Sequence, residues 1–162
     1  MGAALAGDRK PVPFLTMPYL QSQGQFYPVA SAGSHWVAYI SNETGRNEVY
    51  VQSFPPGAGK VQVSSEGGVQ PRWRRDGREL FYIAADGKLI AAEMKRASST
   101  FKIVSSKELF QTRMLLGVGG RTNYVFRYDV AADGKRFLIV AEPEGQTQPI
   151  TVVLNWASGL RK

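Results

Sequence analysis

The sequence predicts an all-β protein of short antiparallel strands, and three observations support this fold class. The chain of 162 residues is 43% hydrophobic and 11% aromatic, which suffices for the core of one domain. Its seventeen Gly and nine Pro are spread evenly, as many strands joined by tight turns require. Between residues 67 and 94, two Asp-Gly dipeptides separate three apolar runs. Asp-Gly in that setting predicts hairpins in which both central turn residues have φ > 0.

The N-terminal part predicts one strand without a nearby partner. Residues 1–9 look like an artificial or tag-like start, because they have neither the basic nor the apolar region of a signal peptide. Residues 10–16 (KPVPFLT) predict a short strand whose prolines only an edge position tolerates. The sequence does not indicate the cellular compartment.

Three units of strands follow within a single domain, residues 10–162. The first unit, residues 25–64, predicts strands at 25–29, 36–41, 48–53 and 60–64. The second unit, residues 69–112, predicts strands at 69–73, 79–83, 89–94 and, after a looser segment, 107–112. The third unit, residues 124–154, predicts strands at 124–130, 136–141 and 150–154, and is one strand short.

The three units repeat one pattern. Residues 28–41, 71–84 and 128–141 align as strand, glycine turn and aromatic-aliphatic strand. Tyr39 and Tyr82 occupy the same place in two copies, about forty residues apart. A period of that size with four strands per unit is typical of a β-propeller blade.

Four segments carry a resemblance to a known family: RDGRELFY at 75–82, ADGKRFL at 132–138, GRNEVYV at 45–51 and ITVVLNW at 150–156. They resemble the blade signature of TolB-like six-bladed β-propellers, in particular the last part of the propeller that often follows bacterial serine/threonine protein kinase domains. Kinase motifs are absent, so the resemblance implies no kinase activity. It implies the fold far more strongly than a function, since propellers host many functions. Members of the family are often periplasmic or extracytoplasmic.

A ring of six blades needs twice the number of blades that this chain contains. Three blades would leave apolar sheet faces and strand edges exposed. We therefore expect two chains to close head to tail as a homodimeric six-bladed propeller, each donating strand 10–16 to the last blade of the other. A propeller fragment that packs differently is the alternative.

Strand direction in such a ring predicts a polar channel mouth. The predicted ligand-binding residues at the mouth, beside Gln23, are Gln25, Glu66, Gln70, Arg72, Arg121 and Asn123. The predicted rim residues are Asn42, Glu43, Arg46 and Asn47. We expect a non-enzymatic binding module that recognises a protein segment or a small ligand there, with no catalytic residue and no cofactor.

The alternative is a calcium-dependent hydrolase, such as a promiscuous phosphotriesterase, esterase or lactonase. The resemblance suggests it, because other six-bladed propellers hold calcium in the channel with Asn, Asp and Glu oxygens. Here Glu66 and Asn123, with the amide of Gln70, would be the ligands. One carboxylate per chain is few for that ion.

Composition excludes several other chemistries. Without Cys and with His35 as its one histidine, a chain cannot form a thiolate nucleophile, a Cys zinc site or a multi-histidine zinc site. The net charge of +7 would suit a polyanion, with a basic cluster at Arg72, Arg74, Arg75 and Arg78. The scatter of the other basic residues favours an ordinary surface, so nucleic acid is not the expected partner. No run approaches the ~18 apolar residues of a membrane span.

Overall fold

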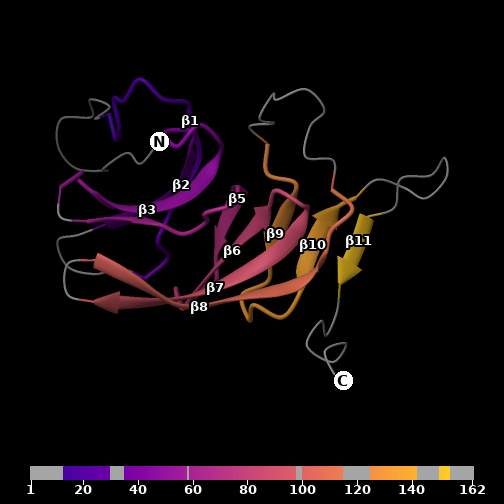
Figure 1. Cartoon of the computed structure of the whole chain (residues 1–162). Helices are drawn as coiled ribbons and strands as arrows, with labels where there is room; N and C mark the ends of the chain where they lie inside the picture. The colour runs from indigo at the N-terminus through magenta and orange to yellow at the C-terminus, as the bar shows by residue number, and fades with distance from the viewer. Residues whose placement is uncertain are drawn as a thin grey trace.

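The computed structural model describes residues 13–29, 35–57, 59–97, 100–114, 125–141 and 150–153. Within these residues the chain is all-β, with no helix, and its strands form three antiparallel sheets. The sheets follow one another in chain order across Figure 1. The predicted all-β class with antiparallel sheets is therefore confirmed.

The first sheet has the order β1-β2-β3-β4, formed by β1 Gln21–Phe26, β2 His35–Ser41, β3 Glu48–Phe54 and β4 Lys60–Gln62. The second has the order β5-β6-β7-β8, formed by β5 Gly68–Trp73, β6 Glu79–Ala84, β7 Lys88–Ala97 and β8 Thr100–Gln111. The third has three strands in the order β11-β10-β9, formed by β9 Tyr128–Val130, β10 Phe137–Val140 and β11 Ile150–Val153. Each sheet thus corresponds to one predicted unit.

Several strand assignments from the sequence are wrong in extent; for example, β9 begins at Tyr128 and not at residue 124, and β4 ends at Gln62 and not at residue 64. The first strand of the first sheet is Gln21–Phe26, not residues 25–29. The segment expected to be loose before residue 107 belongs to β8, which pairs with β7 from Lys88 to Ala97. The pairing extends because Met94 and Phe101, near its far end, are buried in the core shared with the first sheet.

The strand predicted at residues 10–16 is not found in its described part. Residues 13–16 form no strand, and residues 10–12 lie outside the described residues. Phe14 instead packs against the first sheet, with its ring centroid 5.7 Å from those of Tyr39 and Phe54. Proline has no backbone N–H and cannot donate to a strand ladder, so side-chain packing places this segment.

The Asp-Gly turns differ from the expected hairpins in their backbone. The glycines Gly77, Gly87 and Gly134 have φ of +72°, +83° and +69°, whereas no aspartate is among the described residues with positive φ. In each turn the glycine N–H donates to the carbonyl three residues earlier, at 2.8 to 2.9 Å. The expectation of two positive φ angles was wrong, because only the glycine takes the left-handed conformation.

The aspartate side chains of these turns accept hydrogen bonds from the backbone of their own turns. Oδ1 of Asp76, Asp86 and Asp133 accepts a hydrogen bond from the N–H two residues later, at 3.1, 3.1 and 2.9 Å. These hydrogen bonds lower the pKa of Asp86 and Asp133, because the backbone N–H groups stabilise the charged carboxylate.

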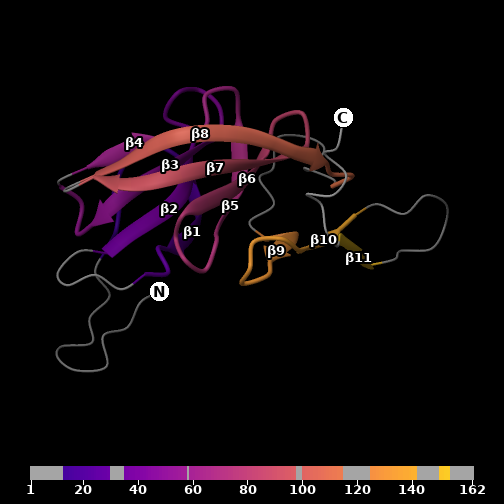
Figure 2. The same cartoon turned by 90° about the horizontal axis from the view of Figure 1, so that it is seen from below.

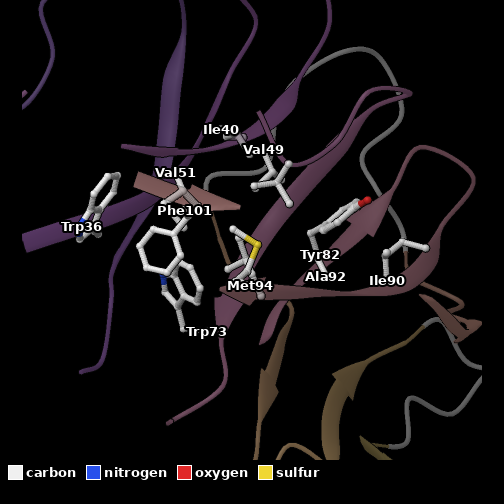
Figure 3. Packing of buried hydrophobic residues seen from close by; sticks show 13 residues of the cluster. Trp36, Ile40, Val49, Val51, Trp73, Tyr82, Ile90, Ala92, Met94 and Phe101 are labelled. Carbon is white, nitrogen blue, oxygen red and sulfur yellow. The ribbon is translucent and has the colours of Figure 1, made fainter. Parts of the chain in front are cut away.

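The second sheet is packed on both faces. Leu80 and Tyr82 of β6 belong to a core shared with the first sheet, and Phe81 and Ile83 belong to a core shared with the third. Figure 3 shows the first core, in which Trp36, Trp73 and Phe101 lie close together; both indole rings are 5.0 to 5.6 Å from the ring of Phe101. Alternation along β6 sends neighbouring side chains to opposite faces.

At both junctions between sheets, the first strand of one sheet lies beside the first strand of the next sheet. The first strands are neighbours, since β1 contacts β5 and β5 contacts β9. At the opposite edges β4 contacts β8, as Figure 2 also shows. The polar residues of β1 and β5 therefore lie along the line where the sheets meet.

Candidate functional site

Two glutamines join the first strands of neighbouring sheets. Gln23 in β1 and Gln70 in β5 are buried, lie where the strand register shifts, and have φ of 55° and 57°. Oε1 of Gln23 accepts a hydrogen bond from the N–H of Gln70, and Oε1 of Gln70 accepts one from the N–H of Arg127; both are 2.7 Å. In both strands, the carboxamide of the glutamine at the register shift thus accepts a hydrogen bond from a backbone N–H of the next sheet.

Gln25 and Arg72 also reach the next sheet. Oε1 of Gln25 accepts a hydrogen bond of 2.7 Å from the N–H of Trp73. Nε of Arg72 donates to the carbonyl of Tyr128 at 3.3 Å and lies 3.8 Å from Oδ1 of Asp129, and its guanidinium lies 3.7 Å from the ring centroid of Phe126. Among the predicted ligand-binding residues, Gln25, Gln70 and Arg72 therefore make contacts between sheets.

The predicted rim lies together with the loop that contains Glu66. Arg46 donates from Nη2 to the carbonyl of Ser65 at 2.8 Å, and the N–H of Gly68 donates to the carbonyl of Asn47 at 2.9 Å. Glu43 forms an ion pair with Lys60. Glu66 itself is exposed. The structure thus brings the 42–47 and 65–68 loops together at the start of β5.

A buried carboxylate that sequence reasoning missed holds these loops. Glu48 is fully buried, and its Oε1 accepts hydrogen bonds of 2.9 Å from Nε of Arg46 and from the N–H of Gly67. Its Oε2 accepts a hydrogen bond from Ser64 Oγ, which itself accepts one from the N–H of Val49 at 2.8 Å. Burial raises the pKa of Tyr82, and the charge of Glu48 raises it further. Nothing in the sequence distinguishes Glu48 from an ordinary strand-entry acid.

Asn42 fixes the approach of the N-terminal segment to the first sheet. Its Oδ1 accepts a hydrogen bond of 2.8 Å from the N–H of Leu20, and its own N–H donates to the carbonyl of Leu20 at 3.2 Å. His35 is exposed at the start of β2, with its ring centroid 6.4 Å from that of Phe26.

The remaining predicted site residues, Arg121 and Asn123, lie outside the described residues. Within the part of the chain that is described, no group of three or more His, Cys, Asp or Glu side chains could hold a metal ion. The same residues contain no helix long and apolar enough to cross a membrane.

The last sheet presents an apolar face to solvent. Along β10, Phe137 and Ile139 are buried against the second sheet, whereas Leu138 and Val140 are 48% and 56% exposed. Exposed apolar side chains grouped on one sheet face often mark an interaction surface.

Comparison of the chain with protein-family models and with curated proteins finds no match.

Proposed function

We propose that this protein is a non-enzymatic interaction module, half of a TolB-like propeller, in which two chains close a six-bladed ring. A protein segment or a small ligand is recognised by the polar loops at its mouth. The observation that carries the proposal is the uncovered face of the third sheet.

That face repeats a position that is covered at the other two sheets. In β2, Ala38 and Ile40 are buried toward the second sheet, and in β6, Phe81 and Ile83 are buried toward the third. Leu138 and Val140 take the corresponding place in β10. A further sheet packed there would complete the series, and a second copy of the chain supplies one.

The loops at the start of β5 offer the recognition surface. Exposed Arg46 and Glu66 carry opposite charges. Their loops are joined by the buried carboxylate of Glu48, which accepts hydrogen bonds from Arg46 and from the N–H of Gly67. Polar loops supported by a rigid sheet are the usual location of binding residues. Closure by twofold symmetry would present each loop twice.

The solution mass tests the proposal. Light scattering over a dilution series should give twice the chain mass of 17.8 kDa, with a monomer appearing on dilution. Leu138→Asp should weaken association by about tenfold or more, because a charge would be buried in the contact. Val104→Asp is the matched control, since Val104 is 55% exposed on β8, away from the proposed face. A monomer at all concentrations would contradict the proposal.

A further inference from the structure

We infer that residues 13–20 cover the face of the first sheet that receives the third sheet of a second copy, so that this segment controls ring closure. The inference rests on the proposed function, and it identifies the surface of the first sheet that would contact the third sheet of the other chain. We call residues 13–20 the cover segment.

The receiving face follows from the alternation along β2. Trp36, Ala38 and Ile40 face the second sheet, so Val37 and Tyr39 face the other way. Phe26 pairs with Val37 in the first sheet as Trp73 pairs with Leu80 in the second. Leu80 and Tyr82 pack against the preceding sheet. Val37 and Tyr39 hold the same places, so their face is built for a preceding sheet.

Aromatic side chains line this face. Tyr39 stacks on Tyr50 with ring centroids 5.8 Å apart, and Phe54 lies 6.4 Å from Phe26. Phe26 remains 47% exposed. The face is therefore apolar enough to receive Leu138 and Val140, and part of it is open in the single chain.

Phe14 of the cover segment covers another part of this face. The ring of Phe14 meets Tyr39 at an interplanar angle of 89° and Phe54 at 61°. The segment ends in the two hydrogen bonds between Leu20 and Asn42. Met17, Tyr19 and Leu20 are exposed, so no other described element covers the segment from outside. Phe14 and an incoming sheet would compete for the same aromatic surface.

Weakening the cover segment should therefore strengthen self-association. We would measure the dimer dissociation constant of the full chain by sedimentation for Phe14→Ser and, at the other end of the segment, for Asn42→Ala. Each should lower the dissociation constant, Phe14→Ser by about tenfold because two ring contacts no longer oppose docking. Met17→Ser is the matched control, since Met17 lies in the same segment but is exposed.

The outcomes separate this inference from the proposed function. Tighter association of both variants with an unchanged Met17→Ser supports it. Unchanged or weaker association of both, while Leu138→Asp still disrupts the dimer, overturns the inference and leaves the proposed function standing. No association in any form overturns both. If thermal melting shows that Phe14→Ser is unfolded, the dimer dissociation constant of Asn42→Ala alone tests the inference.

Discussion

Oε1 of Gln23 lies 2.7 Å from the backbone nitrogen of Gln70, the residue that holds the same place one sheet later. Gln70 repeats the contact with Arg127. Both glutamines have left-handed backbone angles, a conformation that costs a non-glycine residue on the order of 1 kcal/mol. The strand irregularity aims each carboxamide at the next sheet. Arg127 can only donate through its side chain, so this series of acceptors ends at the third sheet.

Gln70→Leu should destabilise the protein by about 2 kcal/mol, because the N–H of Arg127 loses its acceptor in a part-buried contact. Urea unfolding measures the change in free energy. Gln62→Leu, at an exposed position of β4 where the amide donates a hydrogen bond of 2.8 Å to the nearby carbonyl of Ser64, should cost less, about 1 kcal/mol or below. Equal losses in the two variants would contradict a linking role for Gln70.

Glu48→Ala should cost about 3 kcal/mol or more, because Ser64 and the N–H of Gly67 lose a buried acceptor. The matched control is Glu108→Ala, whose side chain is 65% exposed in its ion pair with Lys88 and should contribute less than about 1 kcal/mol. Urea unfolding compares the two. A Glu48 variant as stable as the control would show that the loops do not depend on this carboxylate.

Gly77→Ala should destabilise more than Gly45→Ala, although both glycines have positive φ. A Cβ at Gly77 would overlap the ring of Tyr27, whereas at Gly45 it would meet no atom within 4 Å. Gly45→Ala therefore reports backbone strain alone, about 1 kcal/mol, and Gly77→Ala adds the clash. Thermal melting measures both, and a smaller loss for Gly77→Ala would contradict the packing of its turn against the first sheet.

Acid should destabilise the fold partly through Asp86 and Asp133. Their pKa values are lowered from 3.8 by the backbone N–H groups of Lys88 and Lys135, so the folded state binds protons less readily than the unfolded state. Their stabilising contribution is full above the unfolded pKa and is lost as pH falls through the folded pKa. Stability measured from neutral pH to about pH 2 should fall less steeply for Asp86→Asn/Asp133→Asn than for the unaltered chain. Identical profiles would contradict this assignment.

Calcium distinguishes the binding module from the hydrolase alternative. For the binding module, adding calcium or a chelator should leave the melting temperature unchanged, because no ion is part of the fold. A calcium-dependent rise that Glu66→Ala abolishes would favour the hydrolase, since bound ligand stabilises the folded state by mass action. Glu93→Ala, at an exposed acid on β7, controls for general charge effects.

Local patterns predicted the sheets well. Glycine turns and short apolar runs located all three units, because turn conformation and strand alternation depend on neighbours in the chain. The long β7–β8 pairing was not predictable, since Phe101 extends it by packing with Trp36 and Trp73 of other strands. Prolines 11 and 13 indicated an edge strand, and only the aromatic surface of the first sheet shows where Phe14 packs.

The candidate site was predicted less completely. The clustering of residues 42–47 with Glu66 followed from strand direction, and the structure brings their loops together. The contacts that Gln25, Gln70 and Arg72 make between sheets could not be predicted from the sequence. The sequence pattern of a first strand is the same whether its polar residues face solvent or a neighbouring sheet. Burial of Glu48 was equally invisible, since its donors come from residues 46, 64 and 67.

The sequence by itself determined the all-β class, the repeated unit and the glycine turns, because these depend on periodicity and backbone freedom over a few residues. Only the tertiary structure decided which polar groups are used between sheets, which apolar face stays open at Leu138 and Val140, and where the N-terminal segment lies. Those outcomes depend on contacts between residues distant in the chain, whose partners become known only when the sheets are stacked.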